Sequence, residues 1–170
     1  MSSILWISSM SLPLYNFYGK DFIQSFKKYQ PGSPLWITLD TPINDLKTDN
    51  LIKSYNLTDS KLYHKFIKYN RDRIPINDGG CMSSVELKKI NKYNTRWFGW
   101  YKKVLSLFIG LEEFSFHKQY QMIIWIDCDC LIQQHIPDSY LFSLLNQKSL
   151  AYYYGPFRKK KKMGVESGLV

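Results

Sequence analysis

Three short apolar runs divide the chain and are separated by longer segments of mixed character. Residues 4–7, 35–39 and 122–126 consist almost entirely of apolar side chains. None of the runs shows the polar alternation of a half-exposed strand, and such runs are typical of strands buried on both faces, as in a parallel sheet. We therefore predict three buried strands, of which the run MIIWI at 122–126 is the clearest.

Helical periodicity occupies the segments between these runs. Aromatic side chains recur at spacings of three and four before Pro31 and Gly32, which predicts one amphipathic helix. Its predicted buried face is Tyr15, Tyr18, Phe22, Phe26 and Tyr29. A second helix is predicted after Asp59 or Ser60, and a longer one from about Thr95. The predicted buried stripe of this longer helix is Trp97, Trp100, Val104, Leu107, Phe108 and Leu111.

The alternation of strands and helices determines the expected fold class. Parallel strands need long crossover connections, which are usually helices. We therefore predict an α/β fold that is Rossmann-like, with a mostly parallel central sheet flanked by helices. The strands near residues 4, 36 and 123 should be central neighbours. Asp138 is predicted to cap a helix that runs through Leu145, and residues 150–154 are predicted to form a further strand.

Composition narrows the class of protein. Hydrophobic residues make up 45% and aromatic residues 16% of the 170 residues, which excludes disorder for the bulk of a chain that is the size of one domain. The net charge of +9 favours an anionic partner without choosing among nucleic acid, acidic lipid and phosphorylated small molecules. The basic run 158–162 has no interleaved aromatic platform, so we expect no specific nucleic acid partner. A solvated loop is the simpler interpretation of this run.

Cysteine spacing and the N-terminal sequence bear on the compartment. The three cysteines are an odd number, and Cys128 and Cys130 lie two positions apart, which does not suggest a disulfide framework. Two thiols are too few for a tetrahedral zinc site, so we predict that both are buried core residues. The apolar run at residues 4–7 is too short for a signal peptide or a membrane-spanning helix. We therefore expect a cytoplasmic protein without a transmembrane segment.

Asp127 and Asp129 carry the main chemical signal, because they directly follow the clearest strand. Side chains two positions apart on a strand point the same way, so both carboxylates are expected to face one site. Neighbouring carboxylates repel each other unless a cation lies between them. Oxygen ligands suit hard divalent cations such as Mg²⁺ or Mn²⁺, which can bridge a carboxylate to a diphosphate. Two solvated aspartates at a strand end are the simpler alternative.

The sequence IIWIDCD at 123–129, preceded by WYKKV at 100–104, resembles the GT-A fold glycosyltransferases. In that family an apolar strand ends in Asp-x-Asp, which binds a metal and the nucleotide diphosphate. The resemblance therefore implies that Asp127 and Asp129 are metal ligands and that Asp127 also contacts the donor nucleotide. It places Lys103 near the diphosphate, with Lys102 as the competing register.

The same resemblance implies further site residues. Ser8 and Ser9 correspond to the first nucleotide-binding strand, and Asp40 corresponds to an acid that contacts the nucleoside. The segment Glu166, Ser167 and Gly168 would line the pocket for the donor sugar or the acceptor. The implied activity is transfer of a sugar from a nucleotide-diphosphate donor to an unknown glycan, protein or lipid-linked acceptor, with Mn²⁺ or Mg²⁺. Domains of this family are longer, so we expect residues 1–170 to form a single but incomplete domain that binds donor and transfers sugar poorly.

Two other classes of function remain open from the sequence. Phosphatases of the haloacid dehalogenase type also have an apolar strand that ends in Asp-x-Asp, where the first Asp is a nucleophile. Their motif lies near the N-terminus and continues with Thr or Val, whereas here the motif lies late in the chain and the corresponding residue is Leu131. The other alternative is a basic binding module without enzymatic activity, whose polyanion affinity would fall steeply with salt.

Overall fold

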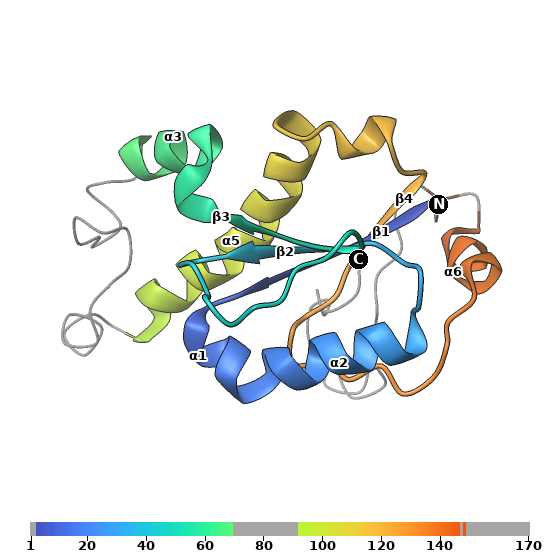
Figure 1. The fold of residues 1–170 in the computed structure, drawn as a ribbon. Helices are drawn as coiled ribbons and strands as arrows, with labels where there is room; N and C mark the ends of the chain where they lie inside the picture. Colours follow the sequence, from blue (N-terminus) through green and yellow to red (C-terminus); the bar gives the residue numbers. More distant parts are fainter. Residues whose placement is uncertain (1–2, 70–91, 147, 149–170) are drawn as a thin grey trace.

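The computed structural model describes residues 3–69, 92–146 and 148. The predicted strand at 150–154, the basic run 158–162 and the segment Glu166, Ser167 and Gly168 lie outside the described residues. Four parallel strands form one sheet in the order β3-β2-β1-β4 (Figure 1). Their bounds are β1 Ile4–Met10, β2 Leu35–Leu39, β3 Ile52–Asn56 and β4 Met122–Trp125.

The predicted parallel α/β arrangement is confirmed, and β1 lies between β2 and β4. Ile7 is in register with Trp36 on one side and with Trp125 on the other. The carboxyl ends of these three strands therefore meet at one edge of the sheet. Strand β3 was not predicted, because its sequence IKSYN is largely polar. In the described part of the chain it pairs only with β2, so much of it stays exposed.

One face of the sheet is covered by a helix in three consecutive parts (Figure 1). These are α1 (Leu12–Leu14), a π-helical turn (Tyr15–Gly19) and α2 (Lys20–Tyr29). Phe22 and Phe26 are buried as predicted, but the prediction for Tyr18 is wrong, because it is 49% exposed. The wide π turn shifts the buried face to Gly19. A Cβ atom at Gly19 would lie 2.9 Å from the sulfur of Met10, so only glycine fits without displacing it.

The opposite face is covered by α5 (Lys92–Glu112), and α3 (Lys61–Tyr69) packs against α5. The short 3₁₀ turns Leu57–Asp59 and Phe116–Lys118 and the helix α6 (Asp138–Leu145) complete the described elements. In α6, the cap position is Pro137 rather than the predicted Asp138, which is the first helical residue. Among the described helices, none combines the length and the apolar character needed to cross a membrane.

The buried stripe of α5 differs from the predicted one. Val104 is 45% and Phe108 is 52% exposed, whereas Leu105 and Ile109 are buried against Leu57 and Tyr63. Gly110 allows a close approach of the Phe116 ring, which would lie 2.5 Å from an added Cβ atom. The periodic pattern was correct, but two neighbouring faces of α5 are apolar, and only packing against other parts of the fold selects one.

Candidate functional site at the strand ends

Strand alternation assigns the side chains at the carboxyl edge to two faces. Trp6 and Met10 belong to the cluster under α2, whereas Ile7 and Trp125 belong to the cluster on the α5 side. By the same alternation, Ser9 lies on the α5 side and Ser8 on the α2 side. The site therefore develops on the α5 face, where the helix passes over the ends of β2, β1 and β4.

Two consecutive lysines of α5 bind the two acids that follow β2 and β4, the strands on either side of β1. The ammonium of Lys102 lies 2.5 Å from Oδ2 of Asp40, and that of Lys103 lies 2.5 Å from Oδ1 of Asp127. Successive helical residues point about 100° apart, and β2 and β4, on either side of β1, are roughly 10 Å apart. One lysine therefore turns toward each strand. The sequence left open whether Lys102 or Lys103 faces the site, and in the structure each of them binds an aspartate.

Asp127 is held from two directions at one oxygen. The indole Nε1 of Trp125 donates a hydrogen bond of 2.9 Å to Oδ1, the same atom that binds Lys103. The ammonium of Lys103 also lies 5.9 Å from the centre of the Trp125 ring. Within the described part of the chain, Oδ2 of Asp127 accepts no hydrogen bond. The side chains of Lys103 and Asp127 are 25% and 23% exposed, so solvent and ligands can reach the pair.

Sequence reasoning missed Trp125, although a signal was present. It lies two positions before Asp127, on the same side of the strand, and carries a ring N–H that needs an acceptor when buried. Trp125 is 2% exposed, so its ring is fixed by packing.

The segment that contains Asp129 is a turn and not a continuation of the strand. Strand β4 ends at Trp125, and the N–H of Cys130 donates to the carbonyl of Asp127 at 3.1 Å. The argument that alternation places both carboxylates on one strand face is therefore wrong. Asp129 is exposed, and its charge, like that of Asp127, acts on the thiol of Cys128 between them.

The two cysteines of this turn pack on the core, but only Cys128 is buried as predicted, whereas Cys130 is partly exposed. Cys128 is buried in the cluster under α2, and Cys130 packs against the same cluster. Burial raises the pKa of the Cys128 thiol to about 11, and the negative charges of Asp129 and Asp127 add to this effect. Neither cysteine shares the α5 face with the lysines.

The hydroxyl groups near the strand ends differ in accessibility. Ser9 is half-buried on the α5 side, in register with Thr38 of β2. Thr38 and Ser8 are fully buried, and in the part of the chain that the structure describes their hydroxyls have no hydrogen-bond partner. Ser9 thus lies on the same face as the two ion pairs, Ser8 lies on the other face, and Thr38 is an additional polar residue that the sequence did not single out.

The donor set can be compared with the needs of a divalent cation. Over residues 3–69, 92–146 and 148, no three His, Cys, Asp or Glu side chains are grouped so that they could hold a metal. Mg²⁺, however, is commonly held by one or two carboxylates, with waters and substrate phosphates as the other ligands. Oδ2 of Asp127 and the exposed carboxylate of Asp129 meet that requirement. The residues present therefore fit a cation that binds together with a phosphate ligand.

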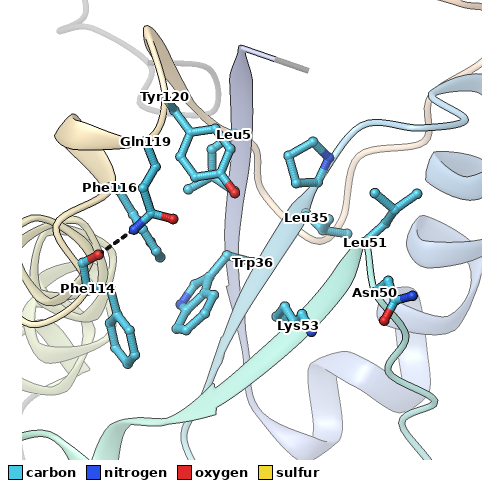
Figure 2. Close-up of a pocket in the computed structure, with 11 residues that line it drawn as sticks. Leu5, Leu35, Trp36, Asn50, Leu51, Lys53, Phe114, Phe116, Gln119 and Tyr120 are labelled. Atoms are coloured by element: carbon cyan, nitrogen blue, oxygen red, sulfur yellow. Dashed lines mark hydrogen bonds between the residues drawn. The ribbon is translucent and has the colours of Figure 1, made fainter. Parts of the chain in front are cut away.

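A separate pocket of about 220 Å³ lies at the amino ends of β1, β2 and β3 (Figure 2). Its walls include the rings of Trp36, Phe116 and Tyr120, and Gln119 Nε2 donates to the carbonyl of Phe114 at 2.8 Å. No carboxylate lines this pocket among the described residues. Because it lies at the end of the strands far from Asp127, it is not part of the charged site.

The strand-end site has a small charge imbalance. Lys102 and Lys103 share this edge with three aspartates, Asp40, Asp127 and Asp129, so these groups together carry one net negative charge. A charge of this sign favours an added cation.

The chain matches no protein-family model, and a search of curated proteins finds no match to it.

Proposed function

We propose that this chain binds a nucleotide-diphosphate sugar at the carboxyl edge of its sheet and belongs to a metal-dependent glycosyltransferase of the GT-A type. The observation that carries the proposal is the pair of lysine–aspartate contacts made by Lys102 and Lys103 above the ends of β2 and β4. In open α/β sheets, ligands bind outside the carboxyl ends of the strands. A diphosphate needs cations, and a divalent cation needs carboxylates, and both kinds of group are present on the same face.

Each group has a role in this proposal. Asp127 and Asp129 would hold Mn²⁺ or Mg²⁺, and the lysines would face the diphosphate. Asp40, directly after β2, and Ser9, on the neighbouring strand β1, would contact the nucleoside. Ser8 is fully buried inside the central strand β1, so it would support the site rather than touch the ligand. When bound, the metal offsets the negative charge that develops on a departing diphosphate.

The acceptor side of the reaction is assigned only by the family resemblance. It places Glu166, Ser167 and Gly168 at the pocket for the donor sugar or the acceptor. We propose that this segment would help to hold the acceptor beside the bound donor, and that the protein acts in the cytoplasm. Transfer needs both reactants to be held together, and positioning contributes roughly 7–11 kcal/mol in the best-oriented reactions.

A thermal-shift screen of nucleoside diphosphates with and without Mn²⁺ tests the proposal. A ligand that binds only the folded state raises the melting temperature. We expect a Mn²⁺-dependent rise that is lost in Asp127→Ala and in Asp129→Ala. Asp21→Asn is the matched control, because it removes one exposed negative charge from α2 on the opposite face of the sheet. The proposal fails if Asp127→Ala and Asp129→Ala keep the metal-dependent shift of the native protein.

The same preparations discriminate between the alternatives. Release of phosphate from a generic aryl phosphate, abolished by Asp127→Ala, would indicate phosphatase chemistry. Polyanion affinity that falls steeply with salt, without any metal-dependent nucleotide binding, would indicate a basic binding module.

A further inference from the structure

We propose that Lys103 is an exchangeable internal cation, which neutralises Asp127 in the empty site and moves to the diphosphate when the metal binds. The inference rests on the proposed function, because it concerns the same metal and the same ligand. It assigns two successive partners to Lys103, and it assigns Trp125 as the residue that keeps Asp127 in place during the exchange.

The contacts of Asp127 explain why an exchange is needed. Lys103 and a divalent cation would both take Asp127 as their nearest negative charge, and two cations in one small site repel each other. Bound Lys103 therefore opposes metal binding. The contact is also accessible, since both side chains keep about a quarter of their exposure, 25% and 23%. The remaining oxygen, Oδ2, gives the metal a first point of attachment before Lys103 leaves Oδ1.

Trp125 gives the exchange a fixed geometry. Its Nε1–H donates to Oδ1 of Asp127, and this bond does not depend on the lysine. The carboxylate therefore keeps its orientation after Lys103 has moved. The Trp125 ring, 5.9 Å from the ammonium, offers the lysine a favourable face along its path.

Lys102 provides an internal comparison. It is the preceding residue of the same helix and also forms a 2.5 Å contact with an aspartate, but its partner is Asp40 on the other side of β1. Its exposure of 17% is slightly lower than that of Lys103. Lys102→Met removes the same charge from the same helix without touching Asp127. It is therefore the matched control for Lys103→Met.

The test measures Mn²⁺ alone and then pyrophosphate in saturating Mn²⁺, by calorimetry on the full chain. Lys103→Met should bind Mn²⁺ roughly fivefold or more tightly than the native protein, because a positive charge next to the metal site is removed. The same variant should bind pyrophosphate several-fold more weakly. Lys102→Met should change Mn²⁺ affinity by less than about twofold, since screening weakens charge effects with distance.

Opposite signs for the two ligands support the exchange. Unchanged or weaker Mn²⁺ binding by Lys103→Met would overturn it, as would equal effects of the two lysine variants on Mn²⁺ affinity. If native protein binds Mn²⁺ through Asp127 but Lys103→Met does not bind it more tightly, only the exchange fails. If Mn²⁺ binding is absent, or is the same in Asp127→Ala, the proposed function fails as well.

A second variant isolates Trp125 as a positioning residue. Trp125→Phe keeps a ring beside Lys103 and removes only the N–H donor. We expect Mn²⁺ to bind several-fold more weakly. Pyrophosphate should bind more weakly only to the extent that less Mn²⁺ is bound. Circular dichroism and melting temperature verify that the variant is folded. An unchanged Mn²⁺ affinity in folded Trp125→Phe would remove Trp125 from the proposal.

Discussion

Two carboxylates beside α5 show how different partners give similar groups different roles. Asp127 faces the ammonium of Lys103 at the strand-end site. Glu113, directly after the last residue of α5, is surrounded by neutral donors instead. It accepts hydrogen bonds from the Ser60 hydroxyl at 2.8 Å and from the Leu62 N–H at 3.0 Å.

The Tyr55 hydroxyl adds a third bond to Glu113, at 3.2 Å. Burial raises the pKa of Glu113, but the bonds from Leu62, Ser60 and Tyr55 outweigh burial and lower its pKa overall. These donors belong to β3 and to the start of α3, so they cannot leave without unfolding part of the structure. The lesson is that a carboxylate held by fixed neutral donors is an anchor, whereas one held by a mobile cation can exchange that cation for a ligand.

The largest expected effect is on the anchor. Glu113→Ala leaves a backbone N–H at the first turn of α3 and two hydroxyls without their acceptor, which should lower the free energy of unfolding by about 2–3 kcal/mol. Denaturant unfolding measures this loss. The neighbouring exposed residue provides the control, because Glu112→Ala should change stability by less than about 0.5 kcal/mol. Equal effects of the two substitutions would contradict the role of Glu113 as an anchor.

A smaller effect is expected at the strand-end site. Asp40→Asn should cost about 1–2 kcal/mol, because it removes the partly buried carboxylate that pairs with Lys102. The double variant Asp40→Asn with Lys102→Met should recover part of that loss. A double-mutant cycle measures the coupling, which should weaken as salt is raised. A coupling of zero, or one as large as the loss at Glu113, would remove the energetic difference between the two regions.

The smallest effect is a change of stability with pH at the anchor. Burial, followed by the charge of Glu113, raises the pKa of Tyr55 from 10.0 to about 12. In this range the unfolded phenol loses its proton while the folded one keeps it, so stability should fall as pH rises from about 10 toward 12. Urea unfolding at several pH values measures the slope. Tyr55→Phe should show a shallower slope than the native protein, and an identical slope would contradict the prediction.

The sequence predicted most of the framework correctly. The runs at 4–7, 35–39 and 122–126 became neighbouring parallel strands, because continuous apolar runs can be satisfied only where both faces are covered. The edge strand β3 escaped notice because a strand covered on only part of its surface needs few apolar residues. The burial of Tyr18 and of Phe108 was predicted wrongly, because helical periodicity identifies a helix more reliably than it identifies the side that packs.

The candidate site was predicted in part. Asp40, Lys103 and Asp127 were identified from the sequence and lie on one face of the sheet in the structure. The sequence offered Lys102 and Lys103 as competing registers, but their roughly perpendicular directions on α5 allow both to find an aspartate. Trp125 and Thr38 were missed, since neither belongs to a motif and each matters only through its position.

The sequence by itself thus determined three of the four described strands, the parallel class of the sheet and the identity of the charged groups, because apolar runs and helical periodicity are local properties. The tertiary structure alone decided which charges meet. Asp40 and Lys102 are 62 positions apart and Asp127 and Lys103 are 24 apart. Their pairing depends on the order of β2, β1 and β4 and on the rotation of α5 about its axis. These quantities are set by the packing of many side chains together, so no single segment encodes them.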